Sequence, residues 1–227
     1  MSMGDIEGRK HRIAVVEDHP LVRAGFVDMI GSEPDLEVVG EAGDAPSALG
    51  LLESARPDLM VIDLVLARGS GLELIKQIHA LNPDQKILVS SMHADTVYAE
   101  RVLQAGAMGY VNKHEPAERV LAAIRTILDG QIYLSESMTD AVLHALRDDD
   151  QLKREPHALD TLSDRELEVF GLIGKGLTTR AIADRLQLSV KTIDSHREHI
   201  KEKLGLRTMN ELIRSAVGWV HGAGSAR

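Results

Sequence analysis

LMVIDLVLARGSGLELIKQIHAL, residues Leu59 to Leu81, reads as a strand, a short loop and a helix in succession. The run LMVI is apolar throughout and ends at Asp63, as expected of a strand that is buried on both faces. From Gly71 onward the apolar residues recur at spacings of three and four, which predicts an amphipathic helix. A strand joined to a helix by a short loop is the repeating unit of a parallel α/β sheet.

The same unit recurs on both sides of this stretch. Further strands are predicted for RIAVV (12–16), LEVVGEA (36–42), KILVSS (86–91) and GYVNK (109–113). Further helices are predicted for residues 19–32, 45–55, 95–106 and 116–130. Strict alternation of strand and helix indicates a five-stranded parallel, doubly wound α/β sheet with helices on both faces.

The composition is that of a soluble globular protein, with 44% hydrophobic and 27% charged residues. There is no cysteine, which excludes disulfides, thiolate metal sites and cysteine catalysis. Residues 1–12 lack the apolar run of a secretory signal, and no segment approaches the length of apolar chain that spans a bilayer. We therefore expect a cytoplasmic protein with no membrane contact.

Charge divides the chain in two. Residues 1–146 carry 12 Lys and Arg against 22 Asp and Glu, whereas residues 161–227 carry 11 against 8. Between them, ALRDDDQLKREPHALD has the mixed charge and proline of a solvated linker. The predicted organisation is an α/β domain over 10–131, a short helix and linker over 132–160, and a small all-α domain over 161–221. Polyanion binding is expected only in the last of these.

Chemically distinctive residues follow the strands of the first domain. In an open parallel sheet, functional groups collect beyond the carboxyl ends of the strands. Carboxylates that converge there would repel one another unless a cation lies among them, and their hard oxygens favour Mg²⁺. A nearby hydroxyl and ammonium group could hold a phosphoryl group, so the pattern predicts phosphoryl transfer onto a carboxylate. The residues concerned are Glu17, Asp18, Asp63, Ser90, Ser91 and Lys113.

This order of residues resembles the receiver domain of two-component response regulators, which has a flavodoxin-like fold. The resemblance implies that Asp63 is the phosphoacceptor of a sensor histidine kinase in a phosphorelay. It also implies that Glu17, Asp18 and Asp63 bind Mg²⁺ with the backbone carbonyl of Val65. The switch residues would be Ser91, with Ser90 as second choice, together with Lys113 and Tyr110. His19 and His93 are expected to cap or line loops near the site.

Two features of the loop after Asp63 leave alternatives open. The family usually has proline where this chain has Ala67, so the loop should be less ordered in advance because φ is not fixed there. A constitutive DNA binder, whose receiver serves only for protein interaction or dimerisation, therefore remains an alternative. An aspartyl phosphatase would need a second acid at position 65, where Val65 stands, so turnover of a small substrate is disfavoured. We expect no enzymatic activity beyond self-catalysed phosphoryl transfer and autodephosphorylation.

The tail contains VKTIDSHREHIKEKLGL, residues Val190 to Leu206, between a predicted N-cap, Ser189, and a stop at Gly205. A helical wheel places Val190, Ile193, Ile200 and Leu204 on a buried stripe. It places Lys191, Asp194, Ser195, Glu198 and Glu202 on the opposite face. The preceding TTRAIADRL and the turn QLS complete the ingredients of a helix-turn-helix unit, and Ser163 with Glu166 predicts a capping box before it.

The sequence from Leu162 to about Ala216 resembles the LuxR-type DNA-binding domain. The whole chain resembles a NarL/FixJ-type response regulator. The resemblance implies phosphate contacts from Thr178, Thr179, Arg180, Lys191, Thr192 and Arg197, with Lys191 to Lys201 in the major groove. It places the base-reading positions on Asp194, Ser195 and Glu198. The implied partners are double-stranded DNA, a sensor histidine kinase, a second copy of the chain when phosphorylated or bound to DNA, and RNA polymerase as a further candidate.

Two acidic residues, Asp194 and Glu198, lie on the helix face that is expected to contact DNA, although DNA is itself negatively charged. Asp and Glu can accept a hydrogen bond from cytosine N4 in the major groove while repelling phosphates. Asp194 and Glu198 would then lower non-specific affinity and reward the right base. The alternative is that Glu198 pairs with Lys201 or Lys191 as an ordinary solvated helix residue. The sequence thus predicts a bacterial transcription regulator controlled by phosphorylation of Asp63.

Overall fold

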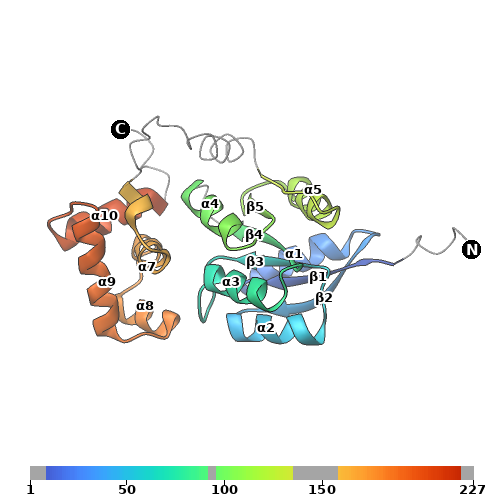
Figure 1. Cartoon of the computed structure of the whole chain (residues 1–227), viewed down its shortest axis with the longest axis horizontal. Helices are drawn as coiled ribbons and strands as arrows, with labels where there is room; N and C mark the ends of the chain where they lie inside the picture. The colour runs from blue at the N-terminus through green and yellow to red at the C-terminus, as the bar shows by residue number, and fades with distance from the viewer. Residues whose placement is uncertain (1–8, 92–95, 135–157, 221–227) are drawn as a thin grey trace, which may run out of the picture. The chain divides into compact units, whose positions relative to one another are not determined.

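The computed structural model describes residues 9–91, 96–134 and 158–220. Most of the predicted short helix and linker, and also His93, lie outside these ranges. The chain divides into two compact units, which are considered separately below (Figure 1).

The first unit is built on one parallel sheet in the order β2-β1-β3-β4-β5, which confirms the predicted doubly wound fold. Its strands are β1 (His11–Val16), β2 (Leu36–Ala42), β3 (Leu59–Asp63), β4 (Lys86–Ser91) and β5 (Gly109–Asn112). Every residue of β3 is buried, as its apolar sequence predicted. A central strand of this kind can lie only where helices cover both faces of the sheet.

The connecting helices are α1 (Pro20–Gly31), α2 (Ala45–Ser54), α3 (Gly71–Leu81), α4 (Thr96–Gln104) and α5 (Ala117–Leu128). Phe26 and Ile30 of α1 share one core with Ile124 of α5 and with Val15 and Val61 of the sheet. The helices α2 and α3 contact each other and lie side by side in Figure 1. Because all five strands point the same way, the loops that follow them meet at one edge of the sheet.

The second unit is helical. Its residues 158–220 form a 3₁₀ turn η1 (Ala158–Thr161), then α7 (Asp164–Gly174), α8 (Thr179–Leu186), α9 (Val190–Lys203) and α10 (Met209–Val220). The predicted capping box is present, because Ser163 Oγ accepts from the backbone N–H of Glu166 and the Glu166 carboxylate accepts from that of Ser163. Ser189 caps α9 as predicted. Between α8 and α9 the chain turns through Gln187, which has a left-handed backbone with φ of 55°.

The predicted buried stripe of α9 is confirmed in its middle and wrong at its start. Ile193 and Ile200 are fully buried, whereas Val190 is 46% exposed. Val190 is the first residue of the helix and follows the exposed cap Ser189, so it lies before the part of α9 that packs on the core. Within the described ranges, no helix combines the length and apolar character needed to cross a membrane.

Candidate phosphorylation site and nucleic-acid interface

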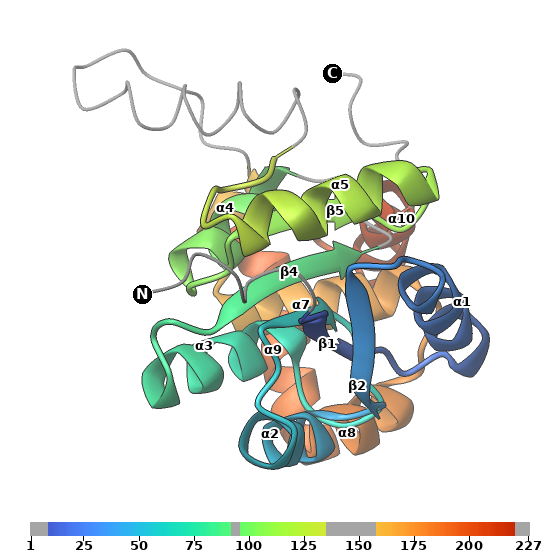
Figure 2. The ribbon, with the colours of Figure 1, turned by 90° about the vertical axis from the view of Figure 1, so that its right-hand side faces the viewer.

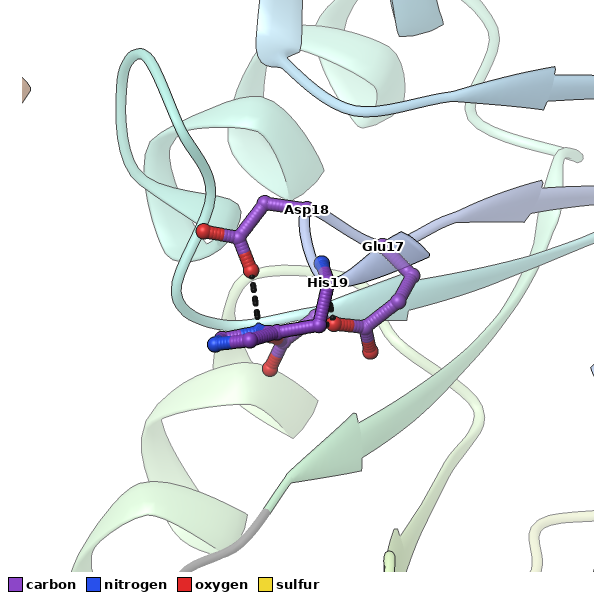
Figure 3. Close-up of side chains that lie close together, drawn as sticks. Glu17, Asp18 and His19 are labelled. Atoms are coloured by element: carbon purple, nitrogen blue, oxygen red, sulfur yellow. Dashed lines mark hydrogen bonds and ion pairs between the residues drawn. The ribbon is translucent and has the colours of Figure 1, made fainter. Parts of the chain in front are cut away.

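Three carboxylates meet where β1 and β3 end. Glu17 and Asp18 follow β1 directly, and Asp63 is the last residue of β3. Glu17 is only 1% exposed and Asp63 only 3%. One ligand atom from each of Glu17, Asp18, His19 and Asp63 can be chosen so that all four lie within 4.8 Å of one another (Figure 3 labels the first three). Sequence analysis grouped the three acids on strand ends alone, and the structure brings them together.

Lys113 supplies a buried positive charge to this cluster. It follows β5, and its backbone N–H donates to the carbonyl oxygen of Ser91 at 2.8 Å, which ties the ends of β4 and β5 together. Its Nζ contacts Glu17 Oε2 and lies 2.8 Å from Asp63 Oδ2. Burial raises the pKa of Asp63, whereas the charge of Lys113 lowers it and the charge of Glu17 raises it again. Burial is the strongest of these effects, and the pKa of Asp63 lies above its usual value.

The predicted switch residues are buried beside the cluster. Ser90 lies opposite Asp63 in the register of β3 and β4, and Ser91 lies opposite Asn112. Tyr110 is completely buried on β5. Ser90 Oγ is buried and has no hydrogen-bond partner among the described residues. Ser90 therefore presents an unused hydroxyl on the strand next to Asp63, and Ser91 and Ser90 both remain candidates for the phosphoryl contact.

The loop after Asp63 is held by backbone hydrogen bonds instead of a proline. The N–H of Ala67 donates to the carbonyl oxygen of Gly43 at 3.2 Å, and the N–H of Ala45 donates to that of Arg68 at 3.2 Å. Proline at position 67 would have no N–H to donate. Val65 pairs with Ser70 across the same loop. The lack of proline therefore does not leave this loop without support.

Arg23 fixes the loop that carries Glu17 and Asp18. Its Nη1 donates to the carbonyl oxygen of Glu17 at 2.6 Å, and its Nε donates to Glu41 Oε2 at 3.3 Å. The side chain of Arg23 comes from the second turn of α1 and Glu41 from β2. One guanidinium thus connects the first acidic loop to the neighbouring strand. The sequence does not predict this role, because an Arg on an amphipathic helix carries no signal of which groups its side chain contacts.

His19 is closer to the acids than its sequence position alone revealed. Its Nδ1 lies 2.7 Å from Asp18 Oδ1 and 3.2 Å from Glu17 Oε1 (Figure 3). Its backbone N–H also donates to Glu17 Oε1 at 3.0 Å. Its position directly after the acid pair was the only sequence signal, and the expectation was of a loop-lining residue, not of a member of the cluster.

The exposed face of α9 has the residues expected of it. Lys191, Asp194, Ser195, Glu198 and Glu202 are all exposed, and the flanking Thr192, His196 and Arg197 are partly buried. The end of α9 is anchored to the start of α7, because Lys203 Nζ lies 2.6 Å from the buried carboxylate of Glu166. Burial alone would raise the pKa of Glu166, but hydrogen bonds from Lys203 and Ser163 outweigh burial and hold this pKa below its usual value.

Several predicted DNA contacts already have partners within the unit. Arg197 donates to Thr179 Oγ1, and its Nη2 lies 2.7 Å from the sulfur of Met209. Thr178 Oγ1 caps α8 by accepting from Ala181 at 3.2 Å. Arg180 is exposed at the start of α8. Arg197 therefore joins α9 to α8 and α10. Its side chain is only 17% exposed, so only a small part of it can meet a phosphate.

The two acids on the exposed face differ in their pairing. Glu198 Oε2 lies 2.8 Å from Lys201 Nζ, which is the pairing that the alternative interpretation of Glu198 expected. Asp194 Oδ1 lies 3.6 Å from Arg197 Nη1, beyond hydrogen-bond distance. Both carboxylates are more than half exposed, at 58% for Asp194 and 59% for Glu198. An exposed pair of this kind contributes little to stability, so either acid can turn to another partner at small cost.

Two family models match separate parts of the chain. Residues 13–125 match the family model described as response regulator receiver domain. Residues 160–216 match the one described as bacterial regulatory proteins, luxR family. The oxygen regulatory protein NreC of Staphylococcus epidermidis is 36% identical over 210 residues, which cover 91% of this chain and 96% of that protein. NreC of Staphylococcus carnosus is 36% identical over 211 residues with the same coverage.

Solved structures of response regulators are also similar to this chain. A LuxR-family two-component response regulator from Aurantimonas sp. is 33% identical, with a TM-score of 0.57, over 61% of this chain and 99% of that one. The RcsB response regulator of Salmonella typhimurium reaches a TM-score of 0.72 over 93% of this chain and 99% of that one. At 23% identity, the RcsB match speaks for the fold alone.

Proposed function

Because the chain belongs to the NarL/FixJ-type response regulators, with a receiver domain before a LuxR-type DNA-binding domain, we propose that Asp63 is its phosphoacceptor. The chain is a DNA-binding transcription regulator of a two-component system. Its partners are accordingly a kinase and DNA, and nothing in the comparisons favours a constitutive regulator with an idle receiver. We place the protein in the cytoplasm, where its sequence and its partners would put it.

The observation that carries the assignment is the contact of Lys113 with both Asp63 and Glu17 inside a buried acidic cluster. A buried carboxylate with a lysine at 2.8 Å is held in one orientation, and it needs a cation beside it to remain ionised. Among the clustered acids, only Asp63 ends a central strand of the sheet. A phosphoryl group on its oxygen would meet the ammonium group of Lys113 at once.

The transfer itself follows from these positions. An oxygen of the Asp63 carboxylate attacks the phosphorus of a phosphohistidine on the kinase, and the P–N bond breaks. The electron pair leaves with the imidazole, which takes up a proton, and an acyl phosphate forms on Asp63. Hydrolysis of the acyl phosphate by water returns the carboxylate and releases inorganic phosphate. The kinase or a small phosphodonor supplies the phosphoryl group, so the chain itself needs no further catalytic acid.

The donor set of the cluster fits a divalent cation. Glu17, Asp18 and Asp63 offer hard carboxylate oxygens within a few ångströms of one another. Val65, two residues after the end of β3, would add its backbone carbonyl. When bound, Mg²⁺ would offset the negative charge of the phosphoryl group. Arg23 holds the loop after β1, and the backbone hydrogen bond between Ala67 and Gly43 holds the loop after β3. These residues position the ligands and do not touch the phosphoryl group themselves.

The response passes through buried residues on β4 and β5. Ser91 would contact the phosphoryl group, with Ser90 as the alternative, and Tyr110 on β5 would change its packing in response. Phosphorylation would then shift the balance between two existing states of the chain. The switched state would bind DNA as a homodimer on two half-sites, and could meet RNA polymerase there. The proposed boundaries remain 10–131 for the receiver and 161–221 for the DNA-binding domain.

The experiment is a comparison of DNA affinity before and after treatment with a small phosphodonor and Mg²⁺. Binding sites are first selected from a random DNA pool with the wild-type chain. The affinity of the wild type for a selected site should rise on treatment, and that of Asp63→Asn should not. Equal affinity before and after treatment, in both proteins, would support the constitutive alternative and overturn the switch.

We propose that α9 reads DNA through Asp194, Ser195 and Glu198. Phosphate contacts would come from Lys191, Thr192, Arg197 and residues 178–180, and Lys201 would end the segment that lies in the major groove. The support is the exposure of this face and the cap residue that starts each helix. The unit carries few excess positive charges, so one copy should bind weakly and a dimer is required for useful affinity. The acids would be selective elements that penalise any site lacking a cytosine amino group.

Glu198→Gln should bind non-specific DNA more tightly and lose discrimination. Removing the charge lessens repulsion from phosphates. It also turns the charge-assisted hydrogen bond from cytosine N4 into a neutral one and adds an NH2 group that can donate to other bases, which lowers the ratio of specific to non-specific affinity by about tenfold. The measurement is that ratio at fixed salt, by fluorescence anisotropy on selected and scrambled sites. Glu202→Gln is the control, since it removes the same charge from the same exposed face nearer the end of α9. An equal ratio of specific to non-specific affinity in both variants would show that Glu198 only pairs with Lys201 and does not read a base.

A further inference from the structure

His19 extends the acidic cluster with a nitrogen. The residue precedes α1 as its N-cap position, yet its side chain makes no capping hydrogen bond to the helix. The ring instead lies against the two acids that precede it, with Nδ1 2.7 Å from Asp18 Oδ1 and 3.2 Å from Glu17 Oε1 (Figure 3). The side chain is 63% exposed, so the ring stands at the mouth of the cluster while Glu17 and Asp63 lie inside it.

These separations are hydrogen-bond and ion-pair distances between the imidazole and the carboxylates, and they also suit neighbouring ligands on one cation. In an octahedral site with bonds of about 2.1 Å, adjacent ligand atoms are about 3 Å apart. The Nδ1 atom lies at about this distance from one oxygen of Glu17 and one of Asp18. One ligand atom from each of these residues and from Asp63 can be chosen so that all four lie within 4.8 Å of one another. The side chains of residues 17, 18, 19 and 63 thus offer three carboxylates and one imidazole to a single point.

Glu17 turns its two oxygens to different partners. Oε2 contacts the ammonium group of Lys113, whereas Oε1 faces the ring of His19 and accepts its backbone N–H at 3.0 Å. The lysine therefore occupies the inner side of Glu17, beside Asp63, and the outer side is shared with His19 and Asp18. Because the carbonyl of Glu17 is bound by Arg23, the backbone that presents both side chains is fixed.

We propose that His19 is a fourth side-chain ligand and that the pocket takes a divalent transition cation of the Mn²⁺ class in preference to Mg²⁺. This inference rests on the proposed function, because it assumes that Glu17, Asp18 and Asp63 bind a divalent cation. Mg²⁺ is held almost wholly by oxygen ligands, whereas transition cations also accept imidazole nitrogen. A site of oxygen ligands alone would bind both cations through the same groups. A nitrogen ligand at the rim of the site would strengthen the binding of Mn²⁺ but not that of Mg²⁺.

The test uses the full chain with Mn²⁺ or Mg²⁺ as the only added cation. Calorimetric titration of His19→Ala should show Mn²⁺ affinity reduced by about tenfold, the lower end of the range for lost support at a metal site, and Mg²⁺ affinity almost unchanged. Pulsed EPR of bound Mn²⁺ should show coupling to a directly bound ¹⁴N in the wild type, which His19→Ala abolishes at saturating Mn²⁺. The control is His11→Ala, an exposed histidine at the opposite end of β1.

His19→Asn separates ligation from hydrogen bonding. Its amide can still donate to the carboxylates but offers no imidazole nitrogen. Loss of the nitrogen coupling and of Mn²⁺ affinity in both variants supports the proposal. Absence of coupling in the wild type, or equal losses for Mn²⁺ and Mg²⁺ in the variants, overturns it while leaving the phosphorylation site intact. Failure of the wild type to bind either cation would overturn this proposal and the proposed divalent site together.

Discussion

Gly71→Ala should reduce the rate of phosphoryl uptake by about a hundredfold, the cost of misplacing a reacting group by about 1 Å. A Cβ built on Gly71 would lie 2.2 Å from the carbonyl oxygen of Asp63 and 2.6 Å from the Cα of Leu64. Both are backbone atoms, so no side chain can turn aside to make room. The backbone at the end of β3 and the start of α3 must then shift apart, and Asp63, the last residue of β3, is displaced.

The same substitution should lower the free energy of unfolding of the receiver by about 3 kcal/mol, toward the upper end of the usual cost of overpacking. Gly50→Ala is the matched control, because no atom lies within 4 Å of a Cβ built there. Gly50 is in the interior of α2, where alanine should stabilise by about 0.5–1 kcal/mol. Hydrogen exchange at β3 measures stability, and intact mass over time measures uptake. A wild-type stability together with a wild-type rate of phosphoryl uptake in Gly71→Ala would contradict the expectation.

Lys113→Ala should destabilise the receiver by about 3–5 kcal/mol at neutral pH, the cost of removing one partner from a buried ion pair. The side chains of Glu17, Asp63 and Lys113 are only 2%, 4% and 6% exposed, so water cannot replace the lost ammonium group. Without Lys113 the two carboxylates face each other uncompensated. Hydrogen exchange at β3, with a chelator present, gives the loss directly. Lys76→Ala, which breaks an exposed pair with Glu73, should cost less than about 1 kcal/mol.

The loss in Lys113→Ala should depend on pH. Burial raises the pKa of Asp63 above its ordinary value of 3.8, and the charge of Lys113 opposes the rise. Removing Lys113 therefore raises this pKa further. Between the ordinary value and the raised one, the folded chain binds a proton more tightly than the unfolded chain, so stability falls as pH rises through this window. The deficit should thus be full above the raised pKa and should shrink as pH falls below it. A deficit that is constant with pH would show that Asp63 is not the carboxylate that Lys113 compensates.

The strands and the acidic cluster were predictable because each depends on a local pattern. The apolar run before Asp63 marks a central strand, and parallel strands bring their ends to one edge, so Glu17, Asp63 and Lys113 had to converge. The caps Ser163 and Ser189 were predictable for the same reason, because a cap bonds only to the next turn of its own helix.

What sequence reasoning missed depends on pairs of residues that are distant in the chain or on the direction of a side chain. The backbone hydrogen bond from Ala67 to Gly43 joins two loops, and no local sequence pattern shows that these loops lie close together. The exposure of Val190 depends on where the core ends, which a helical wheel does not contain. The ring of His19 could have turned to cap α1, and only its observed direction places it against the acids.

The most direct measurement of the central claim is intact mass after incubation with a small phosphodonor and Mg²⁺. The account predicts a gain of one phosphoryl group in the wild type, no gain with a chelator in place of Mg²⁺, and no gain in Asp63→Asn. Asn keeps the shape of the side chain and leaves Lys113 paired with Glu17, so the variant should fold. A gain in Asp63→Asn equal to that of the wild type, or no gain in a wild-type chain that still binds DNA, would contradict the account.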